Sequence, residues 1–262
     1  MARITLRRGL AVAALSAAPL AFMAGPAQAR DHGGSAVAAT LNPMKGSHGH
    51  GTAYLSAVNG NLHVKIHTTG LVPNMPHAQH IHGDTSGKHY FCPTASADRD
   101  GDGYITVEEG LPMYGNIHIS LTTKGDTSPK SGLAVDRMPV ADSNGVVDYD
   151  RVIPGDQLPA GTLAHLQDLH IVQHGVDANN NDKYDLAALG ESTFATSRGV
   201  SGIPAEASDV ATCGMVLPDG AVETGTGSTN GPEHLGLIGM GALALVGAGG
   251  AVVARRRFAR EH

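Results

Sequence analysis

The sequence predicts an all-β domain made of two sheets that pack face to face. Short runs of alternating apolar and polar residues recur along the chain, for example at Thr52–Ala57 and Asn61–Thr68. Asn59-Gly60 between these two runs is a strong hairpin signal, because both residues tolerate the positive φ of a tight turn. Only Leu163–Leu169 has the pattern of a helical turn. A chain of about 170 residues suffices to bury a core between two such sheets.

Alternation also assigns the faces of the individual strands. In the run from 61 to 68, Leu62, Val64 and Ile66 are expected in the core, and the polar residues between them in water. Further short apolar runs, expected to add strands, lie at Tyr114–Thr122, Val135–Val140 and Val146–Val152. Strand, turn and strand at this spacing are typical of an all-β fold.

The stretch Pro76–Asp84 points to metal chemistry. His80 and His82 flank the apolar Ile81, so in a strand both project to the same face, roughly 7 Å apart. Two imidazoles held in this way are half of a transition-metal site, and imidazole suits copper, zinc, iron or nickel. His174 is the best candidate for a third ligand. The alternative is a set of surface histidines in a His-rich secreted protein, against which Ile81 and the following Gly-Asp turn argue.

Three segments resemble, in the same order, strands of copper/zinc superoxide dismutases. The segment His77–Asp84 resembles the family strand that reads His-Gly-Phe-His-Ile-His before a Gly-Asp pair. Ile171–His174 resembles the next copper-ligand strand, and Ala211–Val216 resembles the C-terminal Ala-Cys-Gly-Val-Ile strand. The resemblance spans residues 48–216. It implies a Greek-key β-sandwich or barrel.

The resemblance also implies a copper centre that acts on superoxide. His80, His82 and His174 match the copper ligands and are therefore the expected catalytic residues. His89 is the candidate for the family's bridging histidine, although it follows His82 by only seven residues and precedes the cysteine. His77 matches a family histidine that makes hydrogen bonds and is not a ligand.

Two departures from the family weaken the enzymatic interpretation. The zinc ligands have no counterpart, so zinc is not expected, and the site would hold copper alone or be catalytically silent. Val210 stands where the family has an arginine that attracts superoxide. Arg198 and Lys183 are free to substitute for it, but their spacing does not assign the role. Weak, copper-dependent dismutation is therefore expected.

A non-enzymatic module is the alternative function. Chordin-type extracellular domains resemble the same fold and carry a similar histidine-rich strand. On that interpretation the protein binds calcium, scavenges copper or serves adhesion at the cell surface.

Residues 98–109 satisfy the pattern of a twelve-residue EF-hand calcium loop. The pattern has carboxylates at positions 1, 3 and 5, glycine at 6, a carbonyl ligand at 7 and a bidentate glutamate at 12. The corresponding ligands are Asp98, Asp100, Asp102, Tyr104 and Glu109. Cys92-Pro93 before the loop and Gly110-Leu111-Pro112 after it predict interrupted helices on both sides. The loop is therefore expected to be an isolated insertion in the β-domain.

A second segment after His174 repeats part of this pattern. Its candidate ligands are Asp177, Asn179, Asn181, Lys183 and Asp185. Asp182 replaces the glycine at position 6, and Ala188 replaces the glutamate at position 12. A weaker second calcium loop and an Asx-rich turn are both compatible with this segment.

Both ends of the chain carry targeting features. Residues 1–29 have the positive region, apolar core and Ala-Gln-Ala cleavage site of a signal peptide. Residues 235–254 carry no charge and are long enough for a transmembrane helix, and the basic tail 255–262 is then expected in the cytoplasm. Between these ends we expect a flexible arm at 30–51, the β-domain at 52–216 and a Gly/Thr/Ser linker at 217–234.

The protein is thus expected to be secreted and anchored at the outer face of the cell membrane. The segment Ala221–Gly225 resembles a Leu-Ala-x-Thr-Gly sorting signal with a mismatch, so sortase attachment to the cell wall is the alternative. In an exported chain the two cysteines, Cys92 and Cys213, are expected to form a disulfide.

The charge balance narrows the partners. The signal peptide holds three arginines, and the tail holds four arginines and one glutamate. Outside these two segments 11 of the 18 basic and 23 of the 24 acidic residues remain, which gives a net charge of −12. This balance argues against nucleic acid and for cations as partners. Metal ions, superoxide if the site is active, and the membrane through the C-terminal helix are the expected partners.

Overall fold

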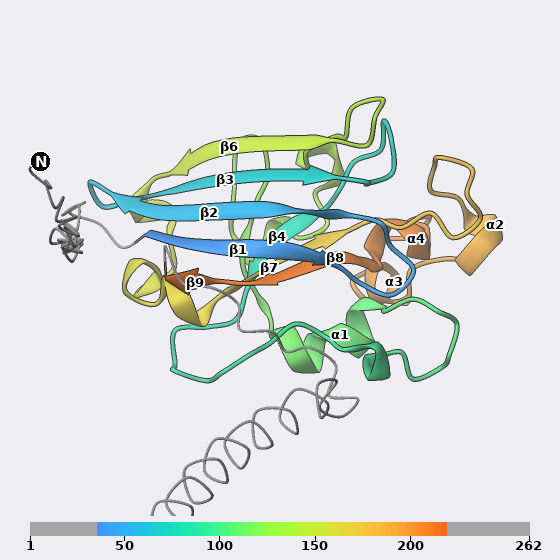
Figure 1. The fold of residues 1–262 in the computed structure, drawn as a ribbon, viewed down its shortest axis with the longest axis horizontal. Coiled ribbons are helices and arrows are strands. Elements are labelled where there is room, and N and C mark those ends of the chain that lie inside the picture. Colours follow the sequence, from blue (N-terminus) through green and yellow to red (C-terminus); the bar gives the residue numbers. More distant parts are fainter. Residues whose placement is uncertain (1–35, 219–262) are drawn as a thin grey trace, which may run out of the picture. The chain divides into compact units, whose positions relative to one another are not determined.

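The computed structural model describes residues 36–218, which form a curled antiparallel sheet with short helices along its edges (Figure 1). The expected signal peptide, the expected linker from residue 219 on, the expected transmembrane helix and the basic tail lie outside the described residues. Within residues 36–218 no helix combines the length and the apolar character that crossing a bilayer needs.

Strands dominate this part of the chain. They are β1 (Ala36–Pro43), β2 (His50–Val58), β3 (Asn61–Thr69), β4 (Gln79–His82), β5 (Ile117–Ser120), β6 (Val147–Ile153), β7 (His170–His174), β8 (Val210–Met215) and β9 (Leu217–Pro218). The α-helices are α1 (Val107–Tyr114), α2 (Leu186–Leu189), α3 (Thr193–Ser197) and α4 (Ala205–Ser208). Short 3₁₀ helices lie at Ala95–Ala97, Pro129–Ser131, Val135–Arg137, Gly155–Gln157, Thr162–Ala164 and Leu166–Asp168.

The strands follow the order β5-β4-β7-β8-β1-β2-β3-β6, with β9 paired to β1. Strand β1 joins two half-sheets, because its first six residues pair with β2 and its last two, Asn42 and Pro43, pair with β8. We call β1-β2-β3-β6 the first half-sheet and β5-β4-β7-β8 the second. Residues of both half-sheets belong to one buried cluster, so the two halves face one another, in agreement with the predicted β-sandwich.

The main core lies between the half-sheets. Leu55 and Val64 of the first half-sheet and Ile81 and Ile171 of the second are all fully buried in one cluster. The hairpin between β2 and β3 turns at Asn59 (φ 50°) and Gly60 (φ 76°), both left-handed, as the sequence predicts. Leu62, Val64 and Ile66 of β3 are buried in this core, whereas Lys65 and His67 are exposed.

A second, smaller cluster lies on the outer side of the second half-sheet. The long connection from β4 to β5 places Ile105 and Tyr114 against Val172 of β7 and Val210 of β8. The predicted Cys92–Cys213 disulfide ties the same connection to β8. A cross-link between residues separated by 121 positions contributes on the order of 4 kcal/mol on the chain-entropy model. The connection is therefore fixed on the sheet and can shape a site there.

The prediction of a flexible arm at residues 30–51 is wrong for much of this segment. Residues Ala36–Pro43 form β1, and β2 already begins at His50. Val37, Ala39 and Leu41 are buried in the main core. The alternation is hard to recognise in the sequence because several of its positions are alanine. In the folded protein, close packing between the half-sheets buries these small side chains together with the larger ones.

The prediction that a helix cannot follow the calcium loop is also wrong. Helix α1 runs through Gly110 and Pro112. Pro112 has no N–H to donate to the Glu108 carbonyl, but the Arg99 guanidinium donates to that oxygen at 3.2 Å. Thr106 and Glu109 form a capping box at the start of the helix. A side-chain donor from the loop thus compensates for the proline.

One expected strand is shorter than the sequence indicates, and another does not form. Only Ile117–Ser120 of the Tyr114–Thr122 run is a strand, because Tyr114 ends α1 and its hydroxyl donates to the Val107 carbonyl at 3.2 Å. The Val135–Val140 run begins with a 3₁₀ helix, where Arg137 donates to the carbonyls of Lys124 and Asp126, and Val140 makes only an isolated bridge with Pro76. The Val146–Val152 strand and the helical turns at 163–169 are confirmed.

Candidate metal centre

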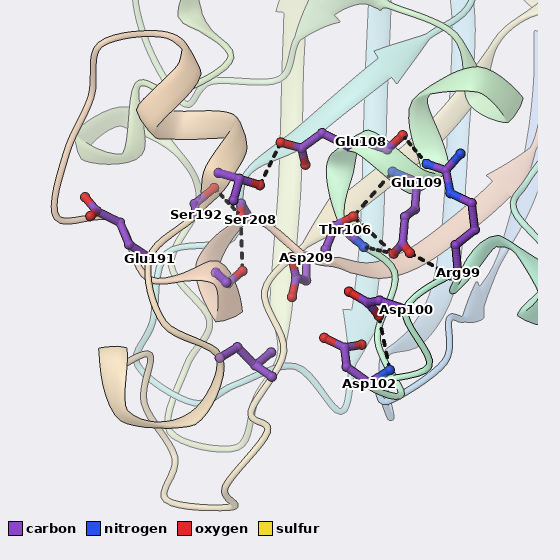
Figure 2. Close-up of a pocket in the computed structure, with 13 residues that line it drawn as sticks. Arg99, Asp100, Asp102, Thr106, Glu108, Glu109, Glu191, Ser192, Ser208 and Asp209 are labelled. Atoms are coloured by element: carbon purple, nitrogen blue, oxygen red, sulfur yellow. Dashed lines mark hydrogen bonds between the residues drawn. The ribbon is translucent and has the colours of Figure 1, made fainter.

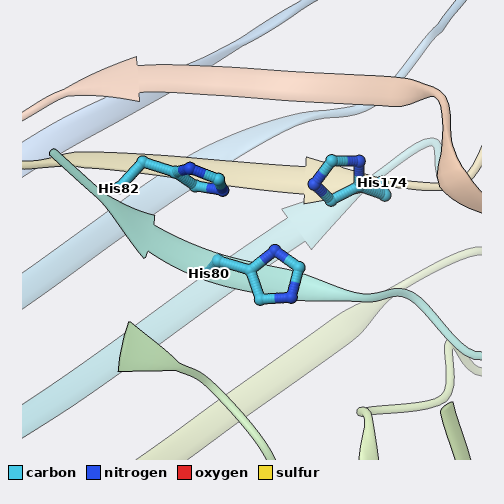
Figure 3. A group of neighbouring side chains, drawn as sticks. All are labelled: His80, His82 and His174. Carbon is cyan, nitrogen blue, oxygen red and sulfur yellow. The ribbon is translucent and has the colours of Figure 1, made fainter. Parts of the chain in front are cut away.

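The three histidines singled out by the sequence come together on the second half-sheet. His80 and His82 project from the same face of β4, and His174 ends the neighbouring strand β7 (Figure 3). Each offers a ring nitrogen, and these nitrogens lie within 4.8 Å of one another. The side chains are only 2–3% exposed. One ion of transition-metal size can therefore contact all three rings.

Backbone carbonyls fix the orientation of each ring. Nε2–H of His80 donates to the Gly132 carbonyl at 3.1 Å, and Nδ1–H of His82 donates to the Gly115 carbonyl at 2.9 Å. Nδ1–H of His174 donates to the Ser208 carbonyl at 2.5 Å. Because one nitrogen of each ring carries the donated proton, the opposite nitrogen of a neutral ring has a free lone pair.

The free nitrogens fit a metal ion. His80 Nδ1 and His82 Nε2 are buried and have no hydrogen-bond partner among the described residues. Burial lowers the pKa of all three imidazoles, to about 3 for His82 and about 4 for His174. The rings are therefore neutral at physiological pH, which is the protonation state that metal ligation needs.

The connection between β4 and β5 supplies part of this arrangement. Gly115, whose carbonyl orients His82, caps the C-terminus of α1. Its φ is 78°, and a Cβ there would lie 2.6 Å from the Tyr90 ring, so a side chain does not fit. The ring of Tyr114, the last residue of α1, packs edge-on against His82 with centroids 4.5 Å apart. The histidine site thus depends on where α1 lies.

His77 supports the site from behind. It is fully buried, and its Nδ1–H donates to the carbonyl of His174 at 2.9 Å. Its Nε2 lies 3.1 Å from the Val72 carbonyl. His77 therefore links the chain before β4 to the end of β7, which agrees with a hydrogen-bonding role.

The structure does not bring His89 to the site. His89 lies in the exposed stretch after β4, and it is not among the three histidines whose nitrogens converge. The short spacing from His82 indicates the reason, because the chain first turns away from the sheet at Gly83 (φ 110°). The bridging role implied by the family resemblance is therefore not met by this residue.

The histidines lie at the wall of an open cavity of about 540 Å³. Apolar side chains of α1, α3 and the strand β5 line much of it, including Leu111, Phe194 and Ile117. Two cations, Lys130 and Arg198, also line it, and the Arg198 guanidinium lies 5.1 Å from the centre of the Phe194 ring. Of the two cations that the sequence left free, Arg198 is at the site and Lys183 is not among the lining residues. Sequence motifs gave no signal for Lys130.

The predicted EF-hand loop brings part of its ligand set together. Carboxylate oxygens of Asp98, Asp100 and Glu109 lie within 4.8 Å of one another. The loop is closed by its own amides, since Asp98 accepts from Gly101 at 2.7 Å and from Gly103 at 3.1 Å. Asp102 accepts from the Tyr104 amide at 2.8 Å and does not belong to the group of three.

Lys45 provides a positive charge at the start of this loop. Its ammonium forms an ion pair with Asp98. The hydrogen bond from Lys45 is the main cause that lowers the pKa of the Asp98 carboxyl. Asp98 is therefore ionised, as a calcium ligand must be.

The second candidate loop closes through its own side chains. Asp177 accepts from the amides of Asn181 and Asp182 at 3.1 and 2.8 Å. The side-chain amide of Asn181 donates to the Asp185 carboxylate at 2.7 Å, and the side-chain amide of Asn179 donates to the same carboxylate at 3.3 Å. Asp182 has a φ of 61°, the left-handed conformation that glycine provides at position 6 of a calcium loop. These contacts are those of an Asx-rich turn, one of the two alternatives.

Comparison with known proteins gives structural similarity only. No family model matches the sequence, and no curated protein sequence matches it. The structure is similar to Cu(II) superoxide dismutase 5 of Candida albicans, with 16% identity, a TM-score of 0.35, and coverage of 76% of this chain and 99% of that one. It is also similar to the Cu/Zn superoxide dismutase of Brucella abortus, with 18% identity, a TM-score of 0.33, and coverage of 70% and 99%. Both similarities are remote.

Proposed function

We propose that this protein is an exported, superoxide dismutase-like domain that binds copper at His80, His82 and His174. The convergence of three buried, neutral imidazoles carries the proposal, because two of their nitrogens otherwise remain buried without a partner. Imidazole ligands suit copper among the transition metals. The family resemblance of the three strands supports copper over the other metals in that class.

The chain's own residues supply the setting for one-electron chemistry. Bound copper would supply electron transfer, taking an electron from one superoxide and giving it to another, with two protons taken up in forming hydrogen peroxide. Lys130 and Arg198 place positive charge at the cavity and would attract a small anion. The carbonyls of Gly115, Gly132 and Ser208 hold the rings in place, so the ligand geometry is preorganised.

Dismutation by the copper-loaded protein tests the enzymatic proposal. We expect activity above that of free copper at the same concentration, and loss of both copper binding and activity in His80→Ala. His89→Ala is the matched control, because His89 is an exposed histidine outside the converging group. Activity no greater than that of free copper, or an unchanged His80→Ala variant, would contradict the proposal.

A non-enzymatic copper-holding module is the second candidate. The net charge of −12 outside the signal peptide and tail favours it, because an acidic exterior repels superoxide. Stoichiometric copper binding that depends on His80 but gives no dismutation would support this function over the enzyme.

We further propose that calcium binds at residues 98–109 and stabilises the metal centre from outside. Glu109, the expected bidentate ligand, lies in the first turn of α1, and the same helix ends at Tyr114 and Gly115 beside His82. A calcium ion would thus fix the helix that orients one copper ligand. The disulfide supports an oxidising, extracytoplasmic location, which suits both a calcium-rich exterior and the expected membrane anchor.

A further inference from the structure

A second cavity lies beside the calcium loop, between it and the segment that holds α2, α3 and α4 (Figure 2). Its volume is about 440 Å³. Its lining is strongly acidic. The carboxylates in the lining belong to Asp100, Asp102, Glu108, Glu109, Glu191 and Asp209.

Asp209 is the unusual member of this group. Its side chain is only 2% exposed, and its Oδ2 has no hydrogen-bond partner among the described residues. A nearby buried acid shows the usual arrangement: Glu206, with no exposed surface, accepts from the amides of Ala178 at 2.8 Å and Asp185 at 2.7 Å. A buried carboxylate oxygen without such a donor needs either a proton or a cation.

The neighbouring cations are engaged elsewhere. Arg99, the basic residue in the lining, donates to the Glu108 carbonyl. Lys45 pairs with Asp98 on the loop. Neither side chain has a contact with Asp209 among those that the structure gives, so neither of these two cations compensates its charge.

Backbone pairing holds Asp209 next to the calcium loop. The amide of the next residue, Val210, donates to the carbonyl of Ile105, the eighth residue of the loop, at 2.9 Å. The Asp209 carboxylate consequently faces Asp100 and Asp102 in Figure 2. These two residues each use one oxygen for a loop amide, those of Asp102 at 3.1 Å and Tyr104 at 2.8 Å.

We propose that this cavity binds a second calcium ion, held directly by Asp209 and through bridging waters by Asp100 and Asp102. Hard cations such as calcium take six to eight oxygen ligands in flexible arrangements, and the volume of the cavity leaves room for waters that complete the shell. The site extends the EF-hand loop with a ligand that lies about 100 residues away in the sequence. It differs from the loop ion because Asp209 is not part of the twelve-residue pattern.

Calcium binding to the full chain, stripped of metal and then titrated with calcium chloride, tests this proposal. We expect Asp209→Asn to bind one calcium per chain fewer than the unmodified protein, as counted by calorimetry and by metal analysis after dialysis. Asp126→Asn is the matched control, because Asp126 is an aspartate outside the cavity that accepts from Ser128 and Ser131. It should keep the full number of ions. Equal calcium counts in Asp209→Asn and the unmodified chain would overturn the proposal.

Folding of the variant is checked separately. The amide of asparagine removes an uncompensated buried charge, so the metal-free Asp209→Asn protein should melt at or above the temperature of the unmodified chain. If this variant does not fold, crystals of the unmodified chain soaked in strontium chloride decide. An anomalous peak at about 2.6 Å from an Asp209 oxygen supports the site, and no peak there overturns it.

Discussion

The carbonyls of Gly115, Gly132 and Ser208 decide which nitrogen of each histidine is free. His80 is left with Nδ1, whereas His82 and His174 are left with Nε2. His80 and His82 are two residues apart on one strand, so this difference in the free nitrogen lets both rings reach one point. Sequence alternation predicts that the two residues share a face, but it contains no information on the tautomers.

The buried imidazoles should make the metal-free protein sensitive to acid. Burial lowers the folded-state pKa of His82 to about 3, whereas the unfolded value is about 6.5. Between these values the unfolded chain binds more protons, so the free energy of unfolding falls as the pH falls from 6.5. Each such histidine contributes up to about 1.4 kcal/mol per pH unit.

Urea unfolding of the metal-free protein at pH 7 and pH 5 measures this effect. His82→Asn should show a smaller difference between the two pH values, because asparagine has no proton to gain and its amide can still donate to Gly115. The exposed His89 is again the control, and His89→Asn should keep the pH dependence of the unmodified chain. Equal pH dependence in His82→Asn and the unmodified protein would show that burial does not depress this pKa.

Among the elements, α1 departs most from what its sequence predicts. Glycine and proline in its centre indicate an interrupted helix. Proline lacks the N–H that would donate to the preceding turn, and glycine without a side chain has a low helix propensity. Two side-chain contacts account for both residues. The Tyr114 ring lies where a Cβ on Gly110 would be, 2.3 Å from its Cε1, and Arg99 takes the carbonyl that Pro112 leaves free. Residues 110 and 114 are neighbours at helical spacing, but the contact of Arg99 with Glu108 cannot be inferred from spacing.

A double-mutant cycle between Arg99 and Pro112 tests this account of α1. Pro112→Ala restores an N–H that can donate to Glu108, so it should stabilise the protein. Arg99→Ala should cost about 1 kcal/mol with Pro112 in place, and less when residue 112 is alanine. Thermal or urea melts of the four proteins give the coupling energy. Additive effects would mean that Arg99 does not substitute for the missing donor.

The position of α1 also connects the proposed calcium of residues 98–109 with the proposed copper. Removing calcium should free the first turn of the helix, where Glu109 lies, and thereby its last residues beside His82. We expect a calcium chelator with no copper affinity of its own to lower both the melting temperature and the copper affinity. Glu109→Gln should show the same low copper affinity without chelator, and the chelator should not lower that affinity further. Unchanged copper affinity in both experiments would contradict the connection.

At the scale of the whole domain, the fold class and the disulfide follow from the sequence, but the assembly of the site does not. Period-two alternation and an Asn-Gly turn are local signals. The structure has the predicted strands β2 and β3 and the predicted turn between them. Strand β1 escapes detection because its pattern is built partly on alanine. The walls of the histidine cavity come from α1, the segment after β5 and α3. Only the folded sheet brings these segments together, so Lys130 could not be assigned from sequence.

The charge distribution of the whole domain gives opposite expectations for the approach of an anion. The net charge of −12 outside the expected signal peptide and tail repels superoxide at long range, whereas Lys130 and Arg198 attract it at the cavity. At physiological salt, exposed charges farther than about 8 Å are largely screened, so the two local cations should dominate the last part of the approach.

The rate of a copper-loaded enzyme should therefore fall as salt is added. In a Lys130→Ala, Arg198→Ala double variant only the repulsive exterior remains, so its rate should start lower and rise with salt. The measurement is kcat/KM for superoxide from 20 to 300 mM sodium chloride. If the rate of the double variant still falls as salt is added, other charges guide the anion. The sign of the salt dependence is set by the charges that lie within one screening length of the histidines.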